Sequence, residues 1–352
     1  MAEQRDRNPT SEPTESSSET RERRRAPEDR SFRERATSPR GRRAVALGVA
    51  ASSIGALAGA TTAQPPGQPV GDATAGMDAT DAVVDFVVSE SWDIEQTRNE
   101  QVDFFIEFLM GKNYDKTKLW LERLGHFGPM IQQKLAERGM PQDLIWLATI
   151  ESGLDPNAYS SAHAAGLWQF IEETGERYGL EVSSYVDERR DPVAATDAAL
   201  DYLQELNERF EGSWYLAAAG YNTGENRVDR IVREQAGGRF GEESVFWEIS
   251  RHLPSETRDY VPVMLAMGHI GKDPAQYGFT DIERQEPLVY DEVRVGGGVK
   301  LADIAKALGV DAEVIEGLNP HLIKKATPPD REWDVRIPQG TTDTFQANWT
   351  KA

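Results

Sequence analysis

Apolar residues recur three and four positions apart through residues 81–279, and this spacing constrains the fold more than any other feature of the sequence. Val102, Phe105 and Leu109 follow it in one stretch, and residues 193–210 follow it in another. Residues three, four and seven apart share one face of a helix, whereas a half-buried strand alternates every second residue. No convincing alternation interrupts this region, so we predict an all-helical domain over residues 81–279.

Local start and stop signals divide this domain into helices. Asp191 followed by Pro192, and Ser213 before Trp214, are typical of helix N-termini, because such side chains accept hydrogen bonds from free backbone amides. Glycine and proline mark the ends. The predicted helices include residues 117–124, 128–138, 167–174, 192–210, 214–220 and 227–235, and a last long helix that begins at Ser255.

Residues 287–340 have a different pattern and form a second, smaller domain by length and periodicity. Residues 289–295 alternate as a strand does, whereas residues 301–308 form an amphipathic helix that ends at Gly309. The predicted elements are a strand at 289–295, helices at 301–308 and 314–318, and a closing strand at 334–338. The predicted fold class is therefore mainly α, with a helical domain and a small βααβ module.

The first 80 residues differ from the rest in composition. Residues 1–43 are charged and almost free of apolar residues, so they cannot bury a core and are expected to be disordered. Residues 44–63 place a short apolar run and small residues after Arg42-Arg43, as a signal peptide does, and residues 64–80 form a linker. We predict export to the periplasm or cell envelope, by the Sec or the twin-arginine route. The alternative is an uncleaved segment that tethers the chain to a membrane.

Composition excludes several kinds of chemistry. The chain has no cysteine, so disulfides, a thiolate nucleophile, cysteine-bound zinc and a lipidated N-terminal cysteine are all excluded. Its formal net charge of −20 argues against nucleic acid as a partner. The five histidines show no metal-binding spacing such as HExxH, and we predict neither a metal site nor a cofactor.

One carboxylate stands where the helical pattern asks for an apolar residue. Leu144, Leu147 and Ala148 share a helix face, and the same spacing continues to Glu151, just before the helix is expected to end at Gly153. Partial burial, apolar neighbours and the negative end of the helix dipole all act to raise the pKa of this carboxyl. A carboxylic acid that stays protonated near neutral pH is suited to general-acid catalysis. The alternative is a frayed helix end that faces water.

Four short motifs then follow one another in order. They are Glu151-Ser-Gly153, Gly166-Leu-Trp-Gln-Phe170, Ala219-Gly-Tyr-Asn-Thr-Gly-Glu225 and Glu256-Thr-Arg-Asp-Tyr-Val-Pro262. Together they resemble lytic murein transglycosylases with a soluble-transglycosylase domain, most closely the membrane-bound type D group. The similarity covers about residues 95–279. It implies a lysozyme-like helical fold with a long groove for peptidoglycan glycan strands.

The resemblance also implies a chemistry. Glu151 is then the single catalytic acid and base. It protonates the glycosidic oxygen between N-acetylmuramic acid and N-acetylglucosamine, and afterwards deprotonates the C6 hydroxyl of the same muramic residue. The product carries a 1,6-anhydro end. Tyr221 and Tyr260 are expected to position Glu151 and the sugar, and Ser160 and Gln169 to bind the glycan. The residues that match the family's cleft are Ser160, Gln169, Tyr221, Asn222 and Tyr260.

Two other functions stay open on the residues alone. A hydrolytic muramidase similar to goose-type lysozymes needs a second carboxylate that activates water. The candidates are Asp155, Glu172, Glu173 and Glu225, all of which we expect at solvated loop or helix positions. The other function is a non-catalytic peptidoglycan-binding scaffold, in which Tyr221 and Tyr260 are ordinary core residues. The presence of Glu151 together with the four motifs argues against the scaffold.

The C-terminal module resembles a LysM domain, a small βααβ glycan binder. Ile304-Ala305, Leu318-Asn319-Pro320 and Ile337-Pro338 fit the resemblance, whereas Gly296-Gly-Gly298 replaces the usual Gly-Asp-Thr turn. The resemblance implies that the module binds peptidoglycan. The replaced turn leaves a second possibility open, in which the module only packs against the catalytic domain.

Overall fold

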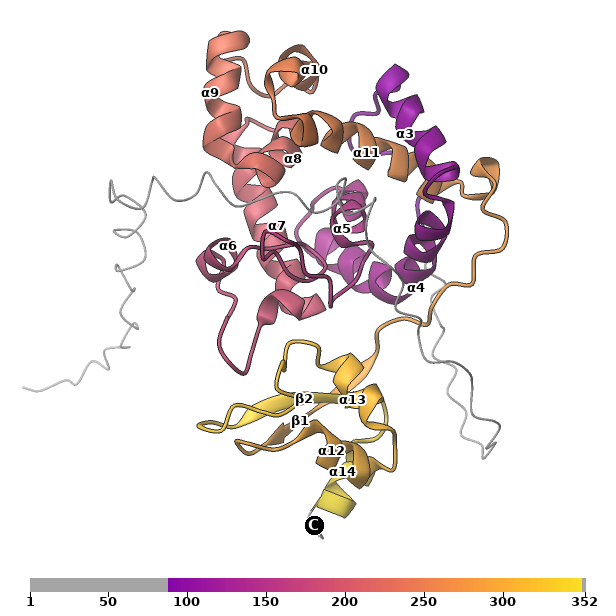
Figure 1. The fold of residues 1–352 in the computed structure, drawn as a ribbon, viewed down its shortest axis with the longest axis vertical. Coiled ribbons are helices and arrows are strands. Elements are labelled where there is room, and N and C mark those ends of the chain that lie inside the picture. Colours follow the sequence, from indigo (N-terminus) through magenta and orange to yellow (C-terminus); the bar gives the residue numbers. More distant parts are fainter. Residues whose placement is uncertain (1–87, 350–352) are drawn as a thin grey trace, which may run out of the picture. The chain divides into compact units, whose positions relative to one another are not determined.

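The computed structural model describes residues 88–349, which form a helical domain followed by a small module with a two-stranded sheet (Figure 1). The helices of the first domain are α3 Glu100–Met110, α4 Tyr114–Glu137, α5 Ile145–Ser152, α6 Glu172–Arg177, α7 Pro192–Arg209, α8 Trp214–Thr223, α9 Glu225–Gln235, α10 Ser244–Ile249 and α11 Ser255–Lys272. The strands and helices of the module are β1 Tyr290–Val295, α12 Leu301–Leu308, α13 Ala312–Leu318, β2 Trp333–Pro338 and α14 Thr342–Trp349. The mainly helical fold class is confirmed.

The predictions for residues 1–43, 44–63 and 64–80, and for the first seven residues of the helical domain, lie outside the described residues. Within residues 88–349, no helix is both long enough and apolar enough to cross a membrane.

Helix α5 lies inside the helical domain rather than on its surface. It packs against α4 and α11, and α11 also packs against α3 and α8, as Figure 1 shows. The segment Ile-Trp-Leu-Ala-Thr-Ile is apolar on nearly all sides, and every residue from Ile145 to Glu151 is buried. A helix that is apolar all round is expected to be enclosed in this way. The carboxylate at its end is therefore carried into the interior.

The end of α5 is fixed by a glycine, as the sequence predicts. Gly153 adopts a left-handed conformation with φ of 64°, which favours glycine. A Cβ atom at this position would lie 2.0 Å from Nε1 of Trp120, so α4 packs directly against the turn. Arg123 of the same helix donates from Nη1 to the carbonyl of Gly153 at 3.0 Å. Helix α4 thus holds the turn that follows Glu151.

Helix α4 itself corrects the prediction of two separate helices at 117–124 and 128–138. One helix runs through both, with Pro129 inside it. The glycines read as a break instead permit close packing, since a Cβ on Gly125 would lie 2.3 Å from the carbonyl oxygen of Gln285. The amide of Gln285 also donates to the carbonyl of Glu122 at 3.0 Å. Gly125 is therefore explained by packing against a segment distant in the sequence, which local sequence patterns do not reveal.

The predicted helix caps are confirmed where the sequence placed them. The side chain of Asp191 accepts hydrogen bonds from the amides of Val193 and Ala194, and Pro192 occupies the first helical position of α7. Ser213 caps α8 by accepting from the amide of Leu216 at 3.2 Å. These bonds satisfy backbone amides that a helix leaves free at its N-terminus.

The module is a βααβ unit with an additional helix. Strands β1 and β2 are antiparallel, with Val293 opposite Val335, and both valines are buried in the module's apolar core. Helix α14, which the sequence pattern did not predict, adds Phe345 to that core. The glycines at 296–298 pack against a turn, because a Cβ on Gly297 would lie 2.6 Å from the carbonyl oxygen of Pro329. Close packing therefore explains why a glycine occupies position 297.

A buried ion cluster joins the module to the helical domain. Nη2 of Arg336 lies 2.9 and 3.0 Å from the two carboxylate oxygens of Asp191. Nδ1 of His321 lies 3.0 Å from Oδ2 of the same residue, off the line of a well-directed hydrogen bond. All three side chains are less than 10% exposed. Burial alone would raise the pKa of Asp191, but the contact with His321 and the charge of Arg336 outweigh it and hold this pKa below its usual range.

This depressed pKa predicts a loss of stability in acid. A carboxyl whose pKa is lower in the folded state contributes stability above its unfolded pKa of about 4, and loses it as the pH falls through the folded value. We expect the free energy of unfolding to drop below pH 4 by up to about 1.4 kcal/mol per pH unit from this group. Denaturant unfolding at a series of pH values, with Asp191→Asn and the exposed Asp311→Asn as control, measures it. An acid slope unchanged in Asp191→Asn contradicts the prediction.

Candidate active site

Glu151 is a buried carboxylate with a phenol directed at it. Its residue exposure is 6%, and the hydroxyl of Tyr260 on α11 donates to Oε1 at 2.6 Å. The reading of Glu151 as a frayed helix end facing water is therefore wrong. The two residues are 109 positions apart, and the packing of α11 against α5 brings them together. The expected pairing of Tyr260 with the acid is present in the structure.

Tyr260 remains a hydrogen-bond donor under ordinary conditions. Burial, and then the negative charge of Glu151, raise the pKa of its hydroxyl well above the usual value. A phenol that stays protonated can only donate to a carboxylate oxygen, so it fixes which oxygen of Glu151 is occupied.

Loss of this phenol is expected to lower turnover while the fold persists. In Tyr260→Phe the ring keeps its packing, but Oε1 of Glu151 loses its donor. A hydrogen bond to a charged group contributes about 1.5–3 kcal/mol, so kcat should fall about 10- to 100-fold. Initial rates on purified peptidoglycan measure this, with Tyr114→Phe as control because its hydroxyl donates to the carbonyl of Gly278 and not to Glu151. A wild-type kcat in Tyr260→Phe contradicts the role.

Tyr221 holds backbone rather than the acid directly. Its hydroxyl donates to the carbonyl of Trp168 at 2.8 Å. Burial, and next the charge of Glu151, raise the pKa of Tyr221 well above the usual value, so the ring lies within the electrostatic reach of Glu151. The hydroxyl of Tyr221 thus fixes the turn that carries Gln169, and its predicted role in positioning Glu151 stays a prediction.

Ser160 and Gln169 lie in one tightly folded loop, not on a helix. Oγ of Ser160 accepts from the amide of Ala164 at 3.0 Å, and Nε2 of Gln169 donates to the carbonyl of Gly166 at 2.8 Å. The predicted helix at 167–174 is wrong, because Gly166 and Gln169 both adopt left-handed φ values, 81° and 49°. The helix begins only at Glu172. The left-handed residues turn the chain back, so that Ala165 pairs with both Tyr159 and Phe170.

Asn222 is buried and links two helices through its side-chain oxygen. It lies in α8 with 2% exposure, and its Oδ1 accepts from the hydroxyl of Thr257 on α11 at 2.8 Å. Sequence reasoning did not identify Thr257. Asn222 therefore fixes α8 against α11. Its partner Thr257 lies about one helix turn before Tyr260, which bonds to Glu151.

Arg189 is the second residue that sequence reasoning missed as part of the site. Its side chain pairs with Asp187, with Nε and Nη2 of Arg189 at 2.8 and 2.9 Å from the carboxylate. Its remaining nitrogen, Nη1, donates to the carbonyls of His163 and Phe170 at 2.9 and 3.2 Å. Arg189 is 4% exposed, so it closes the loop that holds Gln169 from the inside. No local pattern distinguishes it from its neighbour Arg190.

The four candidates for a second carboxylate have other surroundings. Glu172 and Glu173 are exposed in the first turn of α6. Asp155 lies 3.3 Å from Nη2 of Arg123 and accepts from the amide of Asn157 at 2.9 Å. Glu225 was expected at a solvated position, but it is 4% exposed.

The burial of Glu225 comes from an aromatic and ionic cluster. Tyr202 donates to its Oε2 at 3.2 Å, and Nη1 of Arg177 lies 3.5 Å from its Oε1. The rings of Tyr202 and Tyr221 lie 5.2 Å apart. Both oxygens of Glu225 thus contact partners within the protein, which makes it a poor candidate for activating a water molecule.

Comparison with known families defines the class of both domains. Residues 129–242 match the family described as Transglycosylase SLT domain, and residues 289–352 match Lytic transglycosylase MltD, LysM-like domain. The chain therefore carries an SLT transglycosylase domain followed by an MltD-type LysM-like domain. The resemblance inferred from the four motifs and from the C-terminal pattern is confirmed.

The chain is also similar to individual known proteins. The chain is homologous to membrane-bound lytic murein transglycosylase D of Escherichia coli strain K12, with 38% identity over 189 residues, 54% of this chain and 41% of that protein. Peptidoglycan transglycosylase gp16 of Escherichia phage T7 is 36% identical over 99 residues, 27% of this chain and 8% of that protein. The structure of the 70 kDa soluble lytic transglycosylase Slt70 of Escherichia coli aligns with a TM-score of 0.37 and 23% identity, covering 52% of this chain and 31% of that one. The chain thus spans less than half the length of these relatives.

Proposed function

We propose that this chain is a peptidoglycan lytic transglycosylase that cleaves the β-1,4 bond between N-acetylmuramic acid and N-acetylglucosamine. The observation that carries the proposal is the buried Glu151 at the end of α5, with Tyr260 bonded to one of its oxygens. The SLT domain around it and the homology to a lytic murein transglycosylase support the same reaction. Glycan strands of peptidoglycan are the proposed substrate.

In the proposed mechanism a single carboxyl serves twice. Protonated Glu151 gives its proton to the glycosidic oxygen as the bond from that oxygen to C1 of the muramic residue breaks. The C6 hydroxyl of the same residue then forms a bond to C1, and its proton returns to Glu151. Neither step adds water, and the acid ends in its starting state. Tyr260 donates to one carboxylate oxygen, which holds Glu151 in place while it gives up and regains the proton.

The surroundings of the other carboxylates favour this route over hydrolysis. An inverting or retaining glycosidase uses two carboxylates that flank the bond. Here Glu225 is occupied by Tyr202 and Arg177, and Asp155 is occupied by Arg123 and backbone. An internal hydroxyl as nucleophile makes a second catalytic carboxylate unnecessary. The hydrolytic muramidase remains the alternative against which the proposal is tested.

We further propose that the protein acts in the cell envelope after export. The signal-like segment at residues 44–63 and the peptidoglycan substrate support this location. Ser160 and Gln169 are proposed to bind the glycan from the loop at 155–170, with Tyr221, Asn222 and Tyr260 maintaining the shape of the cleft.

Solubilisation of peptidoglycan, compared with the formation of reducing ends, tests the proposal. Purified polymer is incubated with the full-length protein, and both the fall in turbidity and the reducing sugars are followed. We expect turbidity to fall without an equivalent rise in reducing ends. Equal rises indicate a muramidase, and co-sedimentation with the polymer without any solubilisation indicates a binding scaffold.

A further inference from the structure

The LysM-like module is attached to one particular segment of the helical domain, residues 181–191. Val186 forms an antiparallel bridge with Leu322, and Val186 is fully buried within the module's own apolar core. The amide of Asp187 donates to the carbonyl of His321 at 2.9 Å, and the amide of Ile323 donates to the carbonyl of Tyr185 at 3.0 Å. An isolated β-bridge and backbone hydrogen bonds therefore join this segment to the module.

The C-terminal end of this segment is fixed by charge. Asp191 receives Arg336 from strand β2 of the module while it caps α7 with the same carboxylate. The guanidinium of Arg336 also stacks over the ring of Tyr290, 4.7 Å from its centroid. Charges this deeply buried are tolerated only when they are paired, so either partner alone would be strongly disfavoured.

The opposite side of the same segment holds the loop that carries Ser160 and Gln169. Arg189 binds the carbonyls of His163 and Phe170 from inside the loop. Arg190 donates to the carbonyl of Asn157 at 3.4 Å and lies over the ring of Tyr159 at 5.6 Å. Two consecutive arginines thus contact both ends of the loop.

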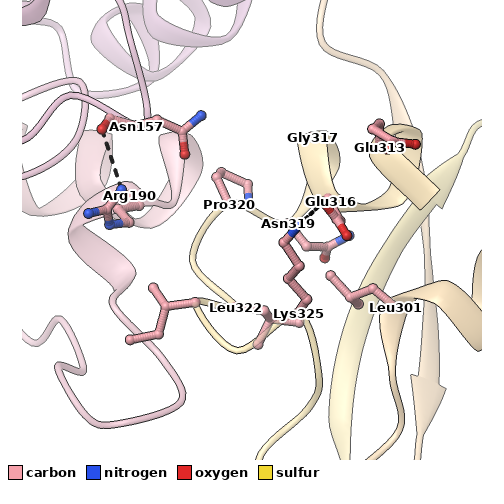
Figure 2. A pocket seen from close by; sticks show the side chains of 11 residues that line it. Asn157, Arg190, Leu301, Glu313, Glu316, Gly317, Asn319, Pro320, Leu322 and Lys325 are labelled. Atoms are coloured by element: carbon pink, nitrogen blue, oxygen red, sulfur yellow. Dashed lines mark hydrogen bonds and ion pairs between the residues drawn. The ribbon is translucent and has the colours of Figure 1, made fainter.

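Figure 2 shows the geometry where the two domains meet. A cavity of about 460 Å³ is lined by Asn157 and Arg190 of the helical domain and by residues of the module that include Pro320, Leu322 and Lys325. The loop and the module therefore line the same space. Arg189 and Arg190 of the segment at 181–191 donate hydrogen bonds to the loop.

We propose that Arg336 of the LysM-like module is a positioning residue for the glycan cleft, acting through Asp191 and Arg189 on the loop at 155–170. The expected effect on glycan kinetics rests on the proposed function, whereas the expected effect on the loop is independent of any activity. Asp191 is two residues from Arg189, and Arg189 is one hydrogen bond from the carbonyl of Phe170, next to Gln169. The module then sets the position of substrate-binding residues, whether or not it binds glycan itself.

The test compares Arg336→Met with Arg336→Lys in the full-length protein. Methionine keeps the length and apolar stem but removes the charge, and lysine restores the charge without the planar fork. The control is Arg294→Met, which removes an exposed arginine paired with Asp334 on the same sheet. Thermal unfolding establishes that each variant is folded.

Two readouts separate positioning from a general loss of stability. The first is the half-saturating concentration of solubilised glycan strands, measured together with kcat. The second is hydrogen exchange at the amides of Ala165 and Gly166, which bond within the loop to Phe170 and Ala158. We expect Arg336→Met to raise the half-saturating concentration about tenfold with kcat changed less than about threefold, and to speed exchange at both amides. In Arg336→Lys, both the half-saturating concentration and the exchange rates should return most of the way to the wild-type values.

Each outcome decides the inference. A folded Arg336→Met with wild-type exchange in the loop overturns it. If Arg336→Met fails to fold, Asp191→Asn takes its place, because asparagine still caps α7 but lacks the charge. Wild-type exchange and affinity in that variant equally overturn the inference. If the wild type proves inactive on glycan, the proposed function fails, yet the exchange measurement still tests the contact between module and loop.

Discussion

Replacement of Glu151 by glutamine is expected to remove catalysis and to leave the fold intact. Glutamine has the same shape, and its carbonyl oxygen can still accept the hydrogen bond from Tyr260. Its amide, however, can neither give a proton to the glycosidic oxygen nor take one from the C6 hydroxyl. General acid–base catalysis contributes about 10²–10⁴-fold to such reactions, so we expect a loss of kcat at least that large. Initial rates of peptidoglycan solubilisation measure it.

The control for this experiment is Glu173→Gln, which neutralises an exposed carboxylate in the first turn of α6. It should retain wild-type turnover. A thermal unfolding midpoint for Glu151→Gln close to or above that of the wild type is expected, because the substitution removes a buried carboxylate. Substantial turnover in a folded Glu151→Gln variant would falsify the assignment of the acid.

Replacement of Gly166 by alanine is expected to disrupt the substrate loop. A Cβ atom at this position would lie 1.6 Å from the carbonyl oxygen of Arg189, and the residue has φ of 81°. The obstacle is backbone rather than a flexible side chain, so the loop or the segment at 188–190 must move. We expect a destabilisation of about 2–4 kcal/mol and a fall in kcat/KM of about 100-fold. Denaturant unfolding and initial rates measure the two effects.

A second glycine separates the clash from the backbone conformation. Gly179 also has a left-handed φ, 89°, but nothing lies within 4 Å of an added Cβ. Gly179→Ala should therefore cost only about 1–2 kcal/mol from strain and leave kcat/KM near the wild-type value. Equal effects from both substitutions would mean that contact between Gly166 and Arg189 has no part in shaping the loop.

The parts of the site that sequence reasoning located are those with a local cause. The apolar spacing up to Glu151 and the glycine after it predict where α5 ends, and both are confirmed by the structure. The caps at Asp191 and Ser213 are confirmed for the same reason, since a cap depends on residues two or three positions away.

The remaining features depend on contacts between distant segments. The glycine at position 125 inside α4 packs against Gln285, and the burial of Glu225 depends on Tyr202 and Arg177. The left-handed conformation of Gln169, a residue that rarely adopts it, cannot be inferred from its neighbours. Tyr260 was associated with Glu151 through the family resemblance, because nothing in its own helix indicates the partner.

The C-terminal module also has features that depend on contacts between distant segments. Periodicity predicts its strands and first two helices, whereas α14 lies beyond the predicted closing strand and is stabilised by packing Phe345 into the core. The ion cluster of Asp191, Arg336 and His321 spans 145 sequence positions between its carboxylate and its arginine. Single-residue patterns did identify Asp191 as a cap, but not as the attachment point of a second domain.

Mass spectrometry of the released muropeptides tests most directly whether Glu151 cleaves glycan strands without water. Purified peptidoglycan is digested in parallel with the full-length wild type and with Glu151→Gln. We predict fragments that end in 1,6-anhydro-N-acetylmuramic acid from the wild type and no such fragments from the variant. Fragments with reducing muramic ends from the wild type would contradict the account, and would direct attention to a water-activating carboxylate instead.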